Sequence, residues 1–139
     1  MKYYGFIILG LFLLASISGV SAQRLVYNTH IDIGSHFTAH QGDVKKIKVE
    51  FWGDDAGIFG SDSYLAYANL HYEVSRGNDY YRAGDLVTNW LSNAYFNIDT
   101  KNLDPGEYDI VILYYGGPGQ FNSFYNPSSK SSKLTVMSR

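Results

Sequence analysis

The stretch Asn102–Gly117, NLDPGEYDIVILYYGG, joins a tight turn to a dense run of apolar residues. Pro105 fixes φ at the start of the turn, and Gly106 can adopt the positive φ that follows. Beyond the turn the side chains alternate between the two faces of a strand. One face carries Tyr108, Ile110, Ile112 and Tyr114, and the other carries Val111, Leu113 and Tyr115. Because both faces are apolar, this strand is predicted to lie in the interior of a sheet.

Alternation with a period of two also runs through the flanking sequence. Lys45–Trp52 places Ile47, Val49 and Phe51 on one face, and Tyr64–Val74 alternates throughout, which predicts one long strand. Shorter strands are predicted in Leu25–Ile33, Tyr80–Arg82, Asp85–Asn89, Ala94–Asp99 and Lys133–Met137. The Gly-, Asp- and Ser-rich stretches 52–63 and 116–132 are predicted loops. The pattern favours an all-β fold of about seven or eight antiparallel strands, a sandwich or a barrel.

The N-terminus has the three parts of a secretory signal peptide. Lys2 precedes an apolar run from Phe6 to Ala15, and small residues end at Ala22. We therefore expect residues 1–22 to form a signal-peptide helix that is cleaved after Ala22, and residues 23–139 to form one domain. An uncleaved N-terminal anchor is the alternative, although the run is shorter than the roughly 20 residues of a typical span.

Charge and cysteine content narrow the class of partner. Residues 23–139 keep all 13 acidic residues and lose Lys2 from the 11 basic ones, so the surface is weakly acidic. Such a balance disfavours nucleic acid, and we expect no contact with membrane after signal cleavage. The chain has no cysteine, so an exported form carries no disulfide.

The turn Leu103–Tyr108 resembles the one that enters the penultimate strand of immunoglobulin-like sandwiches. There a tyrosine hydroxyl bonds to backbone a few residues upstream. Residues 91–137 further resemble the prokaryotic, methanogen-type Ig-like repeats of adhesin-like surface proteins. The matching positions are Leu103, Gly106, Tyr108, Ile110, Ile112, Tyr114, Gly116, Tyr125, Pro127, Leu134 and Val136. The resemblance implies an immunoglobulin-like β-sandwich over residues 23–139, a role in adhesion, and structural roles for Tyr125 and Pro127.

Candidate contact residues are aromatic, because aromatic rings stack on sugars and anchor protein interfaces. Adjacent strand residues point to opposite faces, so at least one of Tyr80 and Tyr81 is expected in solvent. Phe121 and Phe124 fall in the long loop at one end of the domain, where binding loops gather. Trp90 completes the set. Trp90 and Trp52 are also open to an interpretation as covers of the core edge.

No cofactor is expected. Asp54, Asp55 and Asp62 could offer oxygen atoms to Ca²⁺, but their spacing matches neither an EF-hand nor a nonapeptide calcium loop, and a solvated loop is the default interpretation. His30, His36, His40 and His71 are the corresponding nitrogen donors, with exposed polar positions as their default. Motifs of serine, cysteine and zinc hydrolases are absent from the sequence, so we expect no enzyme.

The sequence therefore predicts a secreted or cell-surface module that acts in adhesion or envelope interaction. Its partner would be a cell-envelope polymer, a glycan or a protein. One alternative is a filament subunit that self-associates by edge-strand (donor-strand) pairing through residues 24–33. A carbohydrate-binding module is a further alternative.

Overall fold

The computed structural model describes residues 25–56, 62–119 and 123–139. The predicted signal peptide and Phe121 lie outside these ranges. The described residues form β1 (Leu25–Tyr27), β2 (Thr29–Ile33), β3 (His36–His40), β4 (Val44–Ala56), β5 (Asp62–Tyr64), β6 (Asn69–Arg76), β7 (Asp79–Val87), β8 (Asn93–Asp99), β9 (Gly106–Tyr114), β10 (Gly117–Pro118), β11 (Ser123–Tyr125) and β12 (Ser128–Met137). None of these residues belongs to a helix that could cross a membrane.

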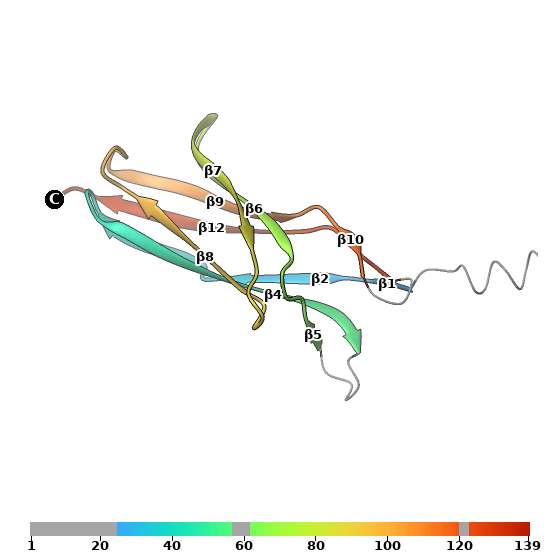
Figure 1. The fold of residues 1–139 in the computed structure, drawn as a ribbon. Helices are drawn as coiled ribbons and strands as arrows, with labels where there is room; N and C mark the ends of the chain where they lie inside the picture. Colours follow the sequence, from blue (N-terminus) through green and yellow to red (C-terminus); the bar gives the residue numbers. More distant parts are fainter. Residues whose placement is uncertain (1–24, 57–61, 120–122) are drawn as a thin grey trace, which may run out of the picture.

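Two main sheets face each other (Figure 1). The five-stranded sheet has the order β3-β12-β9-β6-β7. In the other sheet β4 pairs with β2 along one edge and with both β8 and β5 along the opposite edge. A small third sheet, β1-β11-β10, extends the end at which the described chain begins. This arrangement is an all-β, immunoglobulin-like sandwich, which confirms the predicted fold class.

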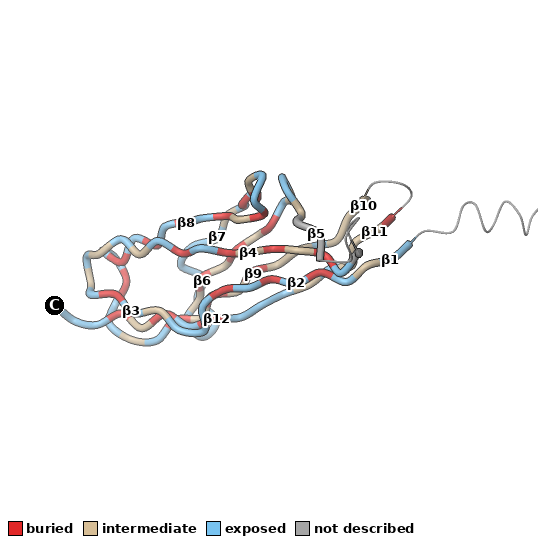
Figure 2. The backbone as a smooth tube through the Cα atoms, turned by 90° about the horizontal axis from the view of Figure 1, so that it is seen from below, coloured by how far each residue is buried: buried red, intermediate tan, exposed pale blue. Residues whose placement is uncertain are grey.

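The core lies between the two main sheets, where buried positions alternate along the strands (Figure 2). The predicted inward faces are confirmed: Ile47, Val49, Phe51, Ala94, Phe96, Ile98, Ile110, Ile112, Leu134 and Val136 are all buried. Tyr72 on β6 stacks on Phe96 on β8, with ring centroids 4.2 Å apart. Ile110 follows Tyr108 by two residues, the place of the second cysteine in antibody domains. Apolar packing therefore joins the sheets where such domains carry a disulfide.

The predicted tyrosine corner is present at the start of β9. Tyr108 is fully buried, and its hydroxyl donates a hydrogen bond to the Asp104 carbonyl, 2.6 Å away. The Arg76 guanidinium lies 5.4 Å from the centroid of the Tyr108 ring, and Tyr81 packs edge-on against it. Gly106 has φ 148°, as the turn requires. β9 pairs with β12 and β6, so it is the interior strand that the sequence predicts.

The prediction of one strand over Tyr64–Val74 is wrong. β5 ends at Tyr64 and β6 begins at Asn69, and the two belong to different sheets. The chain crosses between the layers here, and Tyr67 takes a left-handed φ of 56° to make the bend. Inward alternation holds only within β6, where Leu70, Tyr72 and Val74 are buried.

Other boundaries also differ. The segment 25–33 splits into β1 and β2, and β3 lies in a stretch with no predicted strand. The described part of the predicted loop 116–132 contains β10, β11 and the start of β12, because backbone pairing there does not depend on apolar side chains. The pairs β1–β11 and β12–β3 are parallel.

β7 is a single strand where two short ones were predicted. It pairs with β6 over its whole length, with a register shift beside Ser75. Gly84 has no side chain because the Tyr72 ring lies over it, and a Cβ there would stand 2.9 Å from that ring. Four of the described strands span three residues or fewer, so the strand count exceeds the predicted seven or eight.

The corner hydroxyl makes a first prediction. Tyr108→Phe removes one buried hydrogen bond and keeps the ring, so it should lower the free energy of unfolding by about 1 kcal/mol. Tyr115→Phe is the control, because Tyr115 is exposed. Urea unfolding measures both, and equal stability of the two variants would show that the corner bond contributes nothing.

Candidate functional site

Trp90 lies in the connection between β7 and β8, residues 88–92, which together with Asn93 at the start of β8 is here named the Trp90 turn. Its backbone is held by side chains within the turn. The Thr88 hydroxyl accepts from the Ala68 N–H at 2.8 Å and donates to the Leu65 carbonyl at 2.6 Å. Asn89 Oδ1 accepts from the N–H groups of Leu91 at 2.9 Å and of Asn93 at 3.0 Å. The turn is therefore held both by bonds within it and by bonds to the Leu65 and Ala68 backbone.

Ser92 fastens the turn to β4. Its hydroxyl donates to the Phe51 carbonyl and accepts from the Leu65 N–H at 2.8 Å. In return the Phe51 N–H donates to the Ser92 carbonyl at 3.0 Å. Ser92 is buried and has φ 67°. A non-glycine residue in this conformation stores backbone strain, which here is offset by three hydrogen bonds.

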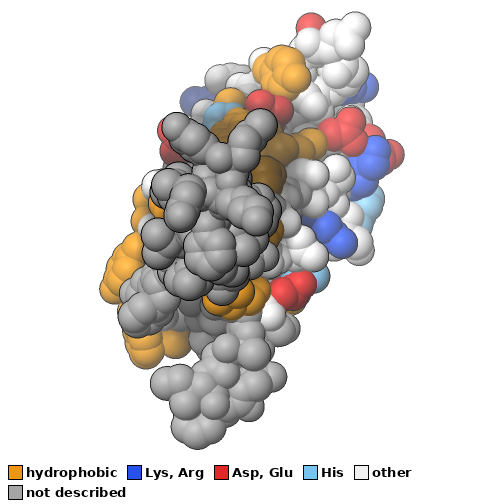
Figure 3. Space-filling model, turned by 90° about the vertical axis from the view of Figure 1, so that its right-hand side faces the viewer, with side chains coloured by type: hydrophobic (Ala, Val, Ile, Leu, Met, Phe, Trp, Pro, Cys, Tyr) orange, Lys and Arg blue, Asp and Glu red, His pale blue; other side chains and the backbone are white. Residues whose placement is uncertain are grey.

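The side chains that this rigid backbone presents are apolar and exposed. Trp90 is 70% exposed and Leu91 46%. Tyr67 is also 70% exposed and lies next to the turn, because its N–H donates to the Thr88 carbonyl at 2.9 Å. In Figure 3, most of the visible charged side chains lie on the right of the sandwich end, and hydrophobic side chains gather at the lower left.

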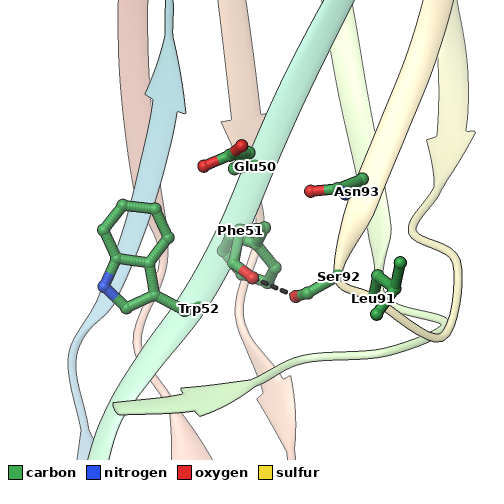
Figure 4. Close-up of a pocket in the computed structure, with 6 residues that line it drawn as sticks. All are labelled: Glu50, Phe51, Trp52, Leu91, Ser92 and Asn93. Carbon is green, nitrogen blue, oxygen red and sulfur yellow. Dashed lines mark hydrogen bonds between the residues drawn. The ribbon is translucent and has the colours of Figure 1, made fainter.

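A pocket of about 210 Å³ opens where the Trp90 turn meets β4. Its lining consists of Glu50, Phe51, Trp52, Leu91, Ser92 and Asn93. In Figure 4, Glu50 and Asn93 lie on either side of one stretch of β4, with the Trp52 ring on the side away from Leu91. The Ser92 hydroxyl is occupied by its backbone bonds. The Asn93 amide makes no side-chain hydrogen bond to any part of the chain that the structure describes.

Two charged contacts border the pocket. Lys48 Nζ lies 2.9 Å from Glu50 Oε1, and this hydrogen bond and the Glu50 charge raise the pKa of Lys48. His30 stacks on Trp52 with an interplanar angle of 26° and also contacts the Asp54 carboxylate. The Glu50 carboxylate is therefore paired with Lys48, and the Asp54 carboxylate is in contact with His30.

The candidate residues from the sequence fall in separate places. Tyr80 is 70% exposed at the far end of β7 from the Trp90 turn. Tyr81 is 43% exposed, but its ring supports Tyr108. Phe124 is half-buried in β11 opposite Val26. The structure thus brings none of these residues to Trp90, and Phe121 lies outside the described ranges.

The metal candidates do not converge in the described residues. Asp54 contacts His30 alone among the charged groups, and the side chains of Asp55 and Asp62 lie outside the description. His36 bonds to Thr135, whereas His71 lies between Glu73 and Asp85. Across ranges 25–56, 62–119 and 123–139, no three His, Asp or Glu side chains are placed to hold a metal ion.

Sequence patterns alone missed Ser92, Asn93, Glu50 and Leu91 as part of a site. A signal was present in Thr88–Asn93, TNWLSN, where residues that bond their own backbone surround an apolar pair. Such residues hold a turn rigid, and the apolar pair is then left on its surface.

No protein-family model matches this chain, and neither does any curated protein. Among solved structures, the CARDB domain of the PF1109 protein from Pyrococcus furiosus, in complex with di-metal ions, matches with TM-score 0.43 and 8% identity over 81% of this chain and 96% of that one. Murine CRIg matches with TM-score 0.42 and 12% identity over 80% and 98%. The strand pairing of this chain by itself defines the sandwich.

The Ser92 hydroxyl makes a second prediction. Ser92→Ala leaves the Leu65 N–H and the Phe51 carbonyl without a partner at a buried site, so it should cost about 2 kcal/mol of stability. Ser129→Ala makes the same chemical change at an exposed position and should cost about 0.5 kcal/mol or less. Thermal and urea unfolding compare them, and a Ser92→Ala variant as stable as Ser129→Ala contradicts the role of the hydroxyl.

Proposed function

We propose that this protein is a secreted or cell-surface, non-enzymatic binding module that contacts a component of the cell envelope through the Trp90 turn. One observation carries the proposal: an indole that is 70% exposed stands on a turn whose Thr88, Asn89 and Ser92 side chains make six hydrogen bonds to backbone in and around the turn. Folding gains little from an exposed Trp. A rigidly held aromatic side chain is, however, the kind of residue that dominates binding interfaces.

The immunoglobulin-like sandwich supports this role because such folds position binding loops at the ends of a stable scaffold. The signal-like N-terminus supports export. A non-enzymatic function is supported by the state of Ser92, the one hydroxyl among the residues that line the described pocket. It is buried and bonded to backbone, so it is not available as a nucleophile.

Polymerisation by strand donation is less well supported. β2 pairs with β4 of its own chain, and its Ile31 and Ile33 are buried in its own core. Donating residues 24–33 to a second molecule would remove both side chains from the core, at about 1.5–3 kcal/mol each. The segment therefore serves the sandwich to which it belongs.

The contact role of Trp90 makes a third prediction. Trp90→Ala should weaken binding to cell envelope isolated from the producing organism by at least tenfold, because a central aromatic anchor contributes about 2 kcal/mol or more. Its melting temperature should stay close to that of the wild type, since the side chain is exposed.

Tyr80→Ala is the matched control, because Tyr80 is equally exposed but lies at the other end of β7. Sedimentation of the purified protein with envelope gives the bound fraction. Equal binding by wild type and Trp90→Ala would remove the Trp90 turn as the contact surface.

Export makes a fourth prediction. The protein recovered from the producing cells should begin at Gln23, as determined by mass spectrometry of its N-terminal peptide. Recovery of a chain that still begins at Met1 would favour the retained anchor.

A further inference from the structure

The pocket beside the Trp90 turn belongs to the outer face of the sheet that contains β4. Because Ile47, Val49 and Phe51 point into the core, their neighbours Glu50 and Trp52 lie on the outer face. In the strand register Asn93 stands directly opposite Glu50, and Tyr95 stands opposite Lys48. Trp52 and Tyr95 are thus four residues apart along the sheet, about 14 Å, with Glu50 and Asn93 between them.

These side chains match the two kinds of surface on a sugar ring. A pyranose has faces lined by C–H groups and a rim of hydroxyl groups. Trp52 and Leu91 offer apolar surface to such a face. The Asn93 amide can both donate to and accept from hydroxyls, and Glu50 can accept. Lys48 contacts only the Oε1 atom of Glu50, so the described contacts leave Oε2 for a hydroxyl donor.

The charges around the pocket favour a neutral ligand. Asp32 stands opposite Glu50 on β2, and Asp54 lies further along β4. Lys48 is held by Glu50, and Lys46 Nζ lies over the Tyr95 ring, 4.7 Å from its centroid. An anionic polymer would therefore meet carboxylates at the pocket, whose lining contains no Lys or Arg. The pocket volume, about 210 Å³, is below the range for sites that enclose a drug-sized molecule, and suits one unit of a larger polymer.

We propose that this pocket binds a sugar ring of a neutral glycan, with Trp52 and Leu91 against the ring and Asn93 and Glu50 on its hydroxyls. Tyr95, which is 45% exposed, extends the surface for the next units of the chain. The inference rests on the proposed function, because it names the ligand class that the same surface takes from the envelope.

The test uses the full chain and soluble neutral oligosaccharides of glucose, mannose and N-acetylglucosamine. The protein has two Trp residues, so Trp90→Phe leaves Trp52 as the only indole, and its fluorescence reports on the pocket alone. One of these oligosaccharides should change that fluorescence in a saturable way, and titration calorimetry of the same Trp90→Phe variant should give the same affinity.

Asn93→Ala should weaken this binding by about tenfold, because the hydroxyl groups of the bound sugar lose their hydrogen-bond partner in the pocket. Asn97→Ala is the matched control, since Asn97 is exposed on the same face of β8 but opposite Lys46, away from the pocket. Neither variant should alter thermal stability. Equal affinity of the two variants for the oligosaccharide overturns the assignment of the pocket.

The two proposals fail in distinguishable ways. One outcome is that the envelope binds the wild type but not Trp90→Ala, while no neutral oligosaccharide alters Trp52 fluorescence. In that case the assignment of a neutral glycan as the ligand is wrong and the proposed function stands. The glycan is also wrong if protease treatment of the envelope abolishes binding and oligosaccharides do not compete. If the wild type binds neither the envelope nor any oligosaccharide, the proposed binding function itself is wrong.

Discussion

The feature on which the site depends is the sharing of one edge of β4 by two strands. β8 pairs with β4 up to Glu50, and β5 pairs with it from Trp52 onward. Phe51 lies between these two paired stretches, and neither β8 nor β5 pairs with it. Its buried backbone groups need partners, and Ser92 supplies them with its carbonyl and hydroxyl. Ser92 directly precedes β8 and adopts a left-handed conformation. The bend that it makes leaves Trp90 and Leu91 exposed to solvent.

Phe51 also joins the site to the core. The Phe51 side chain points inward and packs on Tyr114 of β9, with ring centroids 4.7 Å apart. Burial raises the pKa of Tyr114 by disfavouring its phenolate. β9 in turn begins at the Tyr108 corner. Backbone bonds at Ser92 and ring packing at Phe51 therefore connect the Trp90 turn to the interior strand of the opposite sheet, in a chain without disulfides.

The sequence was sufficient for the fold class because its strongest signals act locally. Pro105, Gly106 and the alternation after Tyr108 fix a turn and an interior strand with no information from elsewhere in the chain. The break between Tyr64 and Asn69 could not be predicted in this way, because alternation continues through a residue that changes sheets. β3, β10 and β11 pair through backbone in polar or short segments, where side-chain periodicity carries little signal. Trp90 could be identified from the sequence as an aromatic candidate. The pocket beside it could not, because it forms only where Glu50 and Asn93 lie opposite each other on two strands.

A rigid turn changes what an exposed Trp can contribute to binding. A flexible loop must lose backbone and side-chain freedom when it meets a partner, and that loss is subtracted from the interaction energy. In the Trp90 turn the hydrogen bonds of Thr88, Asn89 and Ser92 have already fixed the backbone during folding. More of the contact energy of the indole is then available for binding. The strained conformation of Ser92 is thus part of a preorganised surface, and the core contacts of Phe51 hold that surface in place.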